Sequence, residues 1–202
     1  MGRREYSPIA RRSAARLCAS RSERTAPQCA PAAYCGALAA SLASPAGAAL
    51  LASGDGVGLA APQIGQSIRL FVIDTLQIEQ DEKDEPPFQG FKKVFINARK
   101  VEETGKPWSY EEGCLSIPRI RGDVERPETI RLRYQDENFV EYEETFTGIN
   151  ARVVQHEYDH IDGVLFTEKL KPLKKRLIQR KLEDIRLGKI NVEYKMRFFN
   201  GR

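Results

Sequence analysis

Apolar and polar residues alternate in several short stretches of this chain, and alternation with a period of two predicts half-buried β-strands. The clearest alternation runs over residues 129–134 and 139–146, with a polar turn between them. Phe139, Tyr142 and Phe146 are the expected anchors of the second stretch. We therefore predict a β-hairpin in this part of the chain.

Shorter apolar runs predict further strands. Residues 68–74 are apolar and β-branched, and residues 94–96 repeat that character, so we expect a strand at each. Residues 77–90, which are acidic and contain proline, and residues 109–118, which contain glycine and proline, are expected to be loops. Weak alternation over residues 190–199 predicts a terminal strand.

Helical periodicity appears late in the chain. Residues 149–161 place their apolar positions and two histidines on one helical face, because side chains three or four positions apart lie above one another. A second helix is expected over residues 172–187, which begin at a proline and end before a glycine. Together these elements predict an α+β fold, with mostly antiparallel strands around a central helix at 149–161 and with a C-terminal helix.

The composition changes after residue 54. Residues 1–54 are rich in alanine, serine, proline and arginine, and their only acids are Glu5 and Glu23. The first lysine of the chain is Lys83, and residues 55–202 have the lysine, glutamate and isoleucine content of an ordinary globular domain. We therefore expect one domain over residues 55–202, preceded by an atypical segment.

Three interpretations of residues 1–54 stay open. An organellar transit peptide is typically rich in arginine and serine and poor in acids, as this segment is. A flexible tail is the simpler alternative, because proline and alanine without periodic aromatic residues cannot build a core. The third is a frame error in the coding sequence, since alanine, arginine, proline and glycine have GC-rich codons, whereas the later lysines and isoleucines have AT-rich ones.

The composition also excludes some partners. Hydrophobic residues make up 41% of the chain, enough for a core, but no apolar run reaches the roughly 18 residues needed to cross a membrane. The net charge of +4 is mild, and we expect neither a membrane nor DNA as a partner. The four cysteines show no CxxC spacing, which favours a reducing compartment. We expect a bacterial cytoplasmic protein, or an organellar one if residues 1–54 are a transit peptide.

The two histidines of the chain lie in one run, H-E-Y-D-H at residues 156–160. In a helix, His156 and His160 share a face and can bind one metal ion. Glu157 then lies beside the open coordination position, where a general base acts on a bound water. The run therefore predicts the metal site of a hydrolase.

A catalytic site of this type needs a third protein ligand, and the chain has no third histidine. The candidates are Cys114, Glu168 and Glu183. Glu183 would give a gluzincin-like metallopeptidase, although its lysine and arginine neighbours favour a solvated ion pair. Cys114 would bind as a thiolate, although a lone cysteine is more often a small buried apolar residue.

A glycine-rich segment at residues 56–61 admits a different interpretation. It fits G-x-G-x-x-A, and Asp74 follows at the distance found in dinucleotide-binding folds. That fold requires a full helix after the glycines, whereas Pro62 and the strand expected at 68–74 leave no room for one. We therefore reject a dinucleotide site.

Three segments together resemble the peptide deformylase family: GVGLAAPQIG at residues 56–65, EGCLS at 112–116 and QHEYDH at 155–160. H-E-x-x-H alone is moderately specific, but all three segments in this order and spacing are highly specific. The resemblance covers roughly residues 55–190 and does not include the segment with which the family usually begins. It implies hydrolysis of the N-formyl group of N-formylmethionyl nascent peptides, with release of formate.

The resemblance implies a role for each matching residue. Glu157 moves the proton, and the side chain of Gln63 and the backbone N–H of Leu115 stabilise the oxyanion. The bound ion is Fe²⁺, which Zn²⁺, Ni²⁺ or Co²⁺ can replace. The implied metal ligands are Cys114, His156 and His160. The positions that match the family's substrate pocket are Val57, Gly58, Tyr110, Glu112, Arg121, Ile149 and Val153.

Two further contacts are expected. Asp159 and Arg126 are predicted to pair as a brace behind the metal ligands. Residues 169–189 contain nine lysines or arginines and two acids; such a run is usually a solvated face, but in the family this helix contacts the ribosome. An inactive peptide- or ribosome-binding relative remains the alternative to an enzyme, because the family's usual N-terminal segment is missing.

Overall fold

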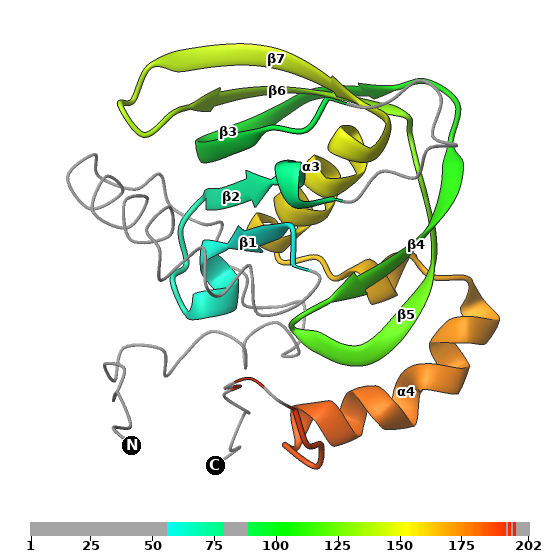
Figure 1. The fold of residues 1–202 in the computed structure, drawn as a ribbon. Coiled ribbons are helices and arrows are strands. Elements are labelled where there is room, and N and C mark those ends of the chain that lie inside the picture. The colour runs from blue at the N-terminus through cyan, green and yellow to red at the C-terminus, as the bar shows by residue number, and fades with distance from the viewer. Residues whose placement is uncertain (1–55, 79–88, 193, 195, 197–202) are drawn as a thin grey trace, which may run out of the picture.

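The computed structural model describes residues 56–78, 89–192, 194 and 196 (Figure 1). The strands within them are β1 (Gly58–Ala60), β2 (Leu70–Asp74), β3 (Lys92–Thr104), β4 (Trp108–Cys114), β5 (Ile117–Arg126), β6 (Thr129–Gln135) and β7 (Glu141–Thr147). The helices are α3 (Gly148–Ile161) and α4 (Pro172–Arg186), with 3-10 helices at Ala61–Ile64, Thr75–Gln77 and Phe166–Lys169. The segment 1–54 lies outside the described residues, so its three interpretations stay predictions.

Five strands form one antiparallel sheet in the order β1-β2-β3-β6-β7, and β4 pairs with β5 in a separate two-stranded sheet. The register of the large sheet follows the apolar alternation of β6. Ile130 lies opposite Phe146, and Ile130, Leu132 and Tyr134 are all buried. A slip of one residue would turn these side chains toward solvent, so the alternation determines the register.

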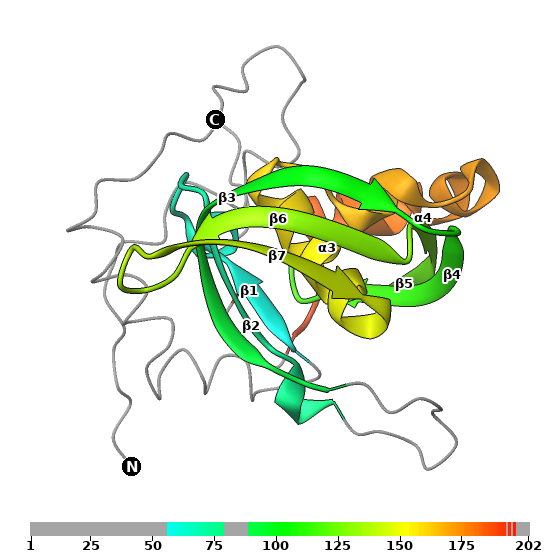
Figure 2. The same cartoon turned by 90° about the horizontal axis from the view of Figure 1, so that it is seen from above.

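Helix α3 covers one face of the five-stranded sheet (Figure 2). Its Ala151, Val154 and Ile161 pack in one apolar cluster with residues of β2, β3 and β6. In the same cluster the rings of Phe71 and Phe95 stack with their centroids 4.6 Å apart. Full burial of one such side chain contributes about 1.5–3 kcal/mol. This packing holds α3, and the histidines that it carries, against the sheet.

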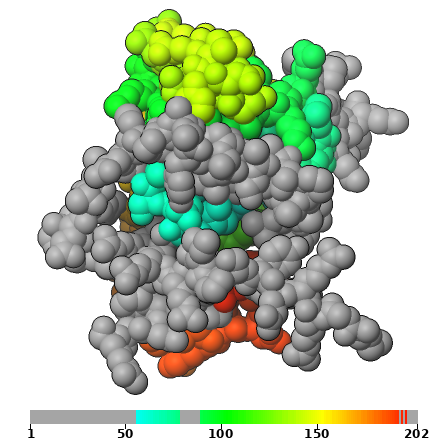
Figure 3. Space-filling model, turned by 90° about the vertical axis from the view of Figure 1, so that its left-hand side faces the viewer, coloured from blue at the N-terminus to red at the C-terminus, as the bar shows by residue number. Residues whose placement is uncertain are grey.

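The β4–β5 hairpin packs against the C-terminal part of the chain. Val124 of β5 shares an apolar cluster with Leu170, Ile178 and Ile185. Gly122 permits this contact, because a Cβ there would lie 2.7 Å from Leu170 Cδ2. Figure 3 shows the end of α4 at the opposite side of the molecule from the β6–β7 hairpin. None of the described helices is long and apolar enough to span a bilayer.

Much of the predicted local structure is confirmed. The fold mixes α and β elements, its strands pair antiparallel, and it has a C-terminal helix. The strands predicted at 68–74 and 129–134 correspond to β2 and β6, and the helices predicted at 149–161 and 172–187 correspond to α3 and α4.

One prediction for the middle of the chain is wrong, and another gives a strand that is too short. Residues 109–118 are not a loop, because they form most of β4 and the start of β5. The one fully buried residue of β4 is Glu112, so this strand has no apolar alternation to reveal it. The strand predicted at 94–96 runs from residue 92 to 104, and its second half is exposed and therefore lacks an apolar signal.

The prediction for the anchors of the β6–β7 hairpin holds in part, and the prediction of a terminal strand is wrong. Of the three expected anchors, Phe146 is buried, and Phe139, which precedes β7 with a φ of 61°, is partly buried against a second apolar cluster. Tyr142 is 41% exposed and is not an anchor. The described residues between 190 and 199 form no strand.

Candidate metal centre and active site

A cluster of possible metal ligands lies where the end of β4 meets α3. It consists of Cys114, His156 and His160, whose ligand atoms all lie within 4.8 Å of one another. Cys114 Sγ is 3.2 Å from His160 Nε2. One sulfur and two imidazole nitrogens at this spacing suit a divalent transition metal that keeps an open position. The residues present therefore fit the predicted ligand set.

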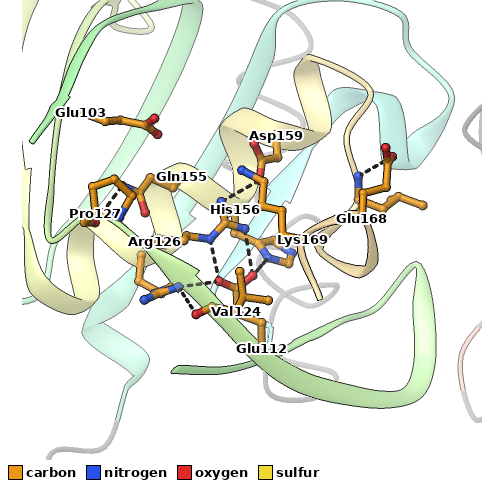
Figure 4. A network of polar contacts seen from close by, with 12 residues as sticks. Glu103, Glu112, Val124, Arg126, Pro127, Gln155, His156, Asp159, Glu168 and Lys169 are labelled. Atoms are coloured by element: carbon orange, nitrogen blue, oxygen red, sulfur yellow. Dashed lines mark hydrogen bonds and ion pairs between the residues drawn. The ribbon is translucent and has the colours of Figure 1, made fainter. Parts of the chain in front are cut away.

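The other two candidates for the third ligand are wrong. Glu168 Oε1 accepts a hydrogen bond from the Leu165 backbone N–H, and Figure 4 shows Glu168 apart from His156. Glu183 is an exposed residue of α4 that pairs with Arg186. A gluzincin-like ligand set is therefore excluded.

A buried carboxylate contacts His156 on the side of its ring that faces away from the cluster. Glu112 Oε2 lies 2.9 Å from His156 Nδ1, which leaves Nε2 as the nitrogen available to a metal. The same carboxylate accepts hydrogen bonds from Arg126 Nε at 2.6 Å and Nη2 at 2.9 Å (Figure 4). Arg152 Nη1 donates a further one at 3.0 Å. Such a carboxylate fixes the tautomer and the ring orientation of a metal-binding histidine.

Arg126 extends this network to Asp159, as predicted. Its Nη1 lies 2.6 Å from Asp159 Oδ2, and Lys169 Nζ lies 2.9 Å from the same oxygen. Burial opposes the ionisation of Glu112, but hydrogen bonds from Arg126 and His156 hold the pKa of this carboxyl below its usual range. Burial would lower the pKa of Arg126, but Glu112 and Asp159 raise it. Glu112 and Arg126 therefore keep their charges although they are buried.

Two side chains at the cluster have pKa values that suit catalysis. Burial would raise the pKa of Cys114, but the charge of His160 and hydrogen bonds from both histidines hold it well below its usual value, which favours the thiolate. Burial raises the pKa of Glu157 against the charges of the two histidines. Glu157 Oε2 is buried and has no hydrogen-bond partner in the described part of the chain. A carboxyl with these properties suits a general base.

Gln63 reaches the cluster from the 3-10 helix Ala61–Ile64. Its Oε1 accepts a hydrogen bond from the Ala60 N–H at 2.7 Å. Its Nε2 therefore faces the hairpin turn, 3.8 Å from Cys114 Sγ and 3.2 Å from Ser116 Oγ. Leu115 lies in this turn between β4 and β5. Gln63 and the turn thus meet at the cluster, as two donors to one oxyanion would have to.

A cavity of about 1240 Å³ opens onto the cluster, which is larger than one methionine side chain needs. The predicted substrate residues all line it: Val57, Gly58, Tyr110, Glu112, Arg121, Ile149 and Val153. Glu112 has a further role beside lining the cavity, because its carboxylate is engaged by two arginines and His156. For the others, contact with a substrate stays a prediction.

Two of the cavity-lining residues that were not predicted, Arg152 and Tyr194, also make hydrogen bonds to site residues. Arg152 precedes His156 by about one helical turn and shares its face, a signal that helical spacing offered. Tyr194 lies beyond α4, and its hydroxyl donates a hydrogen bond to the Leu115 carbonyl at 2.7 Å. No local pattern marks Tyr194, because the described residues around it form no helix or strand.

Known proteins resemble this chain over most of its length. The family model described as Polypeptide deformylase matches residues 40–176. The chain is 54% identical over 151 residues to a peptide deformylase of Christiangramia forsetii, covering 73% of this chain and 77% of that protein. It is 55% identical over 147 residues to a peptide deformylase of Flavobacterium johnsoniae, covering 71% and 75%.

Solved structures of peptide deformylases also match the fold of this chain. Peptide deformylase 1B of Arabidopsis thaliana in complex with an inhibitor matches with a TM-score of 0.67 and 25% identity, covering 90% of this chain and 91% of that one. A peptide deformylase of Legionella pneumophila matches with a TM-score of 0.56 and 37% identity, covering 69% and 76%. The chain therefore belongs to the peptide deformylase family, metal-dependent hydrolases that remove the N-formyl group from nascent peptides.

Proposed function

We propose that the N-formyl group of N-formylmethionyl peptides is hydrolysed in the cavity beside α3, the central element that carries the reacting groups. The observation that carries this proposal is Glu157, whose Oε2 is buried and has no partner in the described part of the chain. This carboxylate lines the same cavity as Cys114 and follows directly on His156. A base, a ligand set and space for a substrate therefore occur together.

Cys114, His156 and His160 would hold one divalent metal, and we propose Fe²⁺, with Zn²⁺, Ni²⁺ or Co²⁺ able to replace it. When bound, the metal supplies a Lewis acid that lowers the pKa of a coordinated water to about 7. A mixed thiolate and imidazole set accepts several of these ions. Glu112 keeps the ring of His156 turned for binding through its hydrogen bond to Nδ1.

Glu157 moves the proton in this proposal. Its carboxylate accepts a proton from the attacking water and delivers it to the leaving amine, so that formate and a free amino terminus are the products. Gly58 leaves the space that the carboxylate occupies, since a Cβ there would lie 2.5 Å from Glu157 Oε1. A side chain at position 58 would therefore displace the base.

Two donors are proposed to stabilise the oxyanion as the formyl carbon becomes tetrahedral. They are Gln63 Nε2 and the Leu115 backbone N–H. The Gln63 amide cannot flip without losing the hydrogen bond from the Ala60 N–H to Oε1, so its NH₂ group is already directed at the site. Removal of one such donor typically costs about 2.7–4 kcal/mol.

The methionine side chain is proposed to enter the apolar part of the cavity, between Val57, Ile149 and Val153. Gly58 lets the backbone of β1 approach the substrate, because it has no Cβ. Tyr110 is 44% exposed and would lie at the entrance. Arg121, whose side chain is 55% exposed, would contact the peptide farther along.

The basic residues of 169–189 are proposed to contact ribosomal RNA. Most of them are exposed along α4, so they are available to phosphate groups. Contacts of this kind weaken steeply with salt. Ribosome affinity should fall between low and moderate salt, and an affinity that did not change would contradict this contact. The enzyme would then work where nascent chains emerge, in the bacterial cytoplasm or in an organelle.

The proposal is tested by release of formate from formyl-Met-Ala-Ser, with protein purified without oxygen and its bound metal quantified. Acetyl-Met-Ala-Ser is the matched control and should not react. Glu157→Gln should keep its metal and lose about 10²–10⁴-fold in kcat, whereas Cys114→Ser should lose metal. Metal-loaded wild-type protein that released no formate would overturn the proposal.

A further inference from the structure

The segment that follows α4 returns to the active site. Val192 and Tyr194 line the same cavity as Glu157. Met196 packs against the apolar cluster shared by β5 and α4. The family model matches only residues 40–176, so the family comparison assigns no role to this segment.

Tyr194 contacts the turn that carries the catalytic groups of the β4–β5 hairpin. Its hydroxyl donates a hydrogen bond to the Leu115 carbonyl at 2.7 Å. Leu115 directly follows Cys114 and lies in the turn between the two strands. The two partners are separated by 79 residues in the sequence, so a distant part of the chain holds the turn from outside the hairpin.

The residues on either side of Leu115 are also held by an element outside the hairpin. Gln63 Nε2 contacts both Cys114 Sγ and Ser116 Oγ. Tyr194 supplies the corresponding contact for Leu115. The three successive residues 114–116, at the end of β4 and in the turn, are therefore each connected to another part of the fold.

We infer that Tyr194 is a positioning residue for the oxyanion donor. The inference rests on the proposed role of the Leu115 N–H. The N–H and the carbonyl of Leu115 are separated by only two rotatable backbone bonds, so a hydrogen bond that fixes the carbonyl also restricts the N–H. A donor stabilises an oxyanion best when it is already aimed at the place where the charge develops.

The inference predicts a particular kinetic signature. The oxyanion forms in the transition state and not in the bound substrate, so a poorly aimed Leu115 N–H lowers kcat and leaves KM almost unchanged. Loss of one neutral hydrogen bond corresponds to a change of about three- to ten-fold. Simple loss of packing would not separate kcat from KM in this way.

The experiment compares Tyr194→Phe with wild type and with Tyr142→Phe. The control residue Tyr142 belongs to β7, is 41% exposed and does not line the cavity. Kinetics with formyl-Met-Ala-Ser are measured per bound metal, and backbone hydrogen exchange is measured over residues 111–118. We expect Tyr194→Phe to lower kcat by about three- to ten-fold, to keep its KM and metal content, and to exchange faster at residues 114–116. Tyr142→Phe should behave as wild type.

Three results would overturn the inference. One is a raised KM at unchanged kcat, which would mean that Tyr194 contacts the peptide itself. Another is a loss of metal with unchanged kcat per metal, and the third is unchanged kinetics and exchange. If the wild-type protein released no formate, the proposed function would fail on its own. The hydrogen bond from Tyr194 to the turn would still be tested by hydrogen exchange, and unchanged exchange in Tyr194→Phe would then overturn the inference.

Discussion

Arginine and glutamate pair in two regions of this protein with similar geometry and different surroundings. Behind the cluster of possible metal ligands, Arg126 and Glu112 approach to 2.6 Å, and their side chains are 2% and 4% exposed. On the exposed side of β6 and β7, Arg133 and Glu143 approach to 3.0 Å, and their side chains are 56% and 35% exposed. Solvent screens the second pair and hardly screens the first.

The surroundings decide what each pair can do. On the surface, either partner can be removed and the other is solvated by water. In the interior, removal of one partner leaves an uncompensated charge, so the network must be complete. The buried network includes His156, and its completeness holds that ring in one orientation. The buried pair therefore specifies geometry at the place where the metal needs it.

The largest effect is expected from breaking the buried network at its centre. Glu112→Gln keeps the size of the side chain but removes the charge that faces Arg126, Arg152 and His156. We expect a loss of about 3–5 kcal/mol in the free energy of unfolding and of about 10–100-fold in metal affinity. Urea unfolding and metal titration measure the two effects. The matched control is Glu143→Gln, and an equal loss in both variants would contradict the comparison.

A smaller effect is expected at the edge of the same network. Arg152 donates to the carbonyls of Val124 and Trp108 as well as to Glu112. Arg152→Met removes these donors, but Glu112 keeps Arg126, so we expect a loss of about 1–3 kcal/mol in the free energy of unfolding. Arg152→Lys should lie between Met and wild type, because it keeps the charge without the planar fork. If the methionine variant were as stable as wild type, Arg152 would not belong to the supporting network.

A third ion pair lies in an environment of intermediate exposure, and its contribution to stability should depend on pH. Lys93 and Glu144 pair at 2.6 Å, and each side chain is 35% exposed. Burial would raise the pKa of Glu144, but hydrogen bonds from Lys93 and Tyr134 lower it below its usual value. Such a group stabilises the fold above its unfolded pKa of about 4.3, and this stabilisation is lost as the pH falls through the folded-state pKa.

The corresponding variant is Glu144→Gln. At pH 7 its free energy of unfolding should be lower than that of wild type by less than about 1 kcal/mol, because solvent screens the pair. The difference should disappear well below about pH 4. Unfolding by urea over a series of pH values measures it, and a difference that increased toward acid would show that the sign is wrong.

The smallest effect is expected on the surface of the sheet. Arg133→Gln removes one of the two arginines that pair with Glu143, and the side chains of Arg133 and Glu143 are both largely open to water. We expect no measurable shift of the urea midpoint, either at low salt or at high salt. A clear loss of stability at low salt that high salt abolished would mean that the exposed pairs act as a network.

The candidate metal ligands were easier to predict from the sequence than the residues that support them. Helical spacing predicted that His156 and His160 share one face, and both belong to the helix α3. Glu112 was expected in the pocket wall, where it lies, but its second role of supporting His156 was not predicted. The strand that carries it was expected to be a loop, because a strand whose buried residue is charged has no apolar alternation.

The paired histidines, the strands β2 and β6 and the helices α3 and α4 could be predicted from the sequence alone, because period, spacing and turn residues are properties of neighbouring positions. Only the tertiary structure decided that Cys114, and not Glu183, joins His160 across 46 residues. It also decided that Tyr194 reaches Leu115. The physical reason is that these distances depend on how the β4–β5 hairpin packs against α3, α4 and the segment after α4. Many buried side chains set that packing together, and no local pattern encodes it.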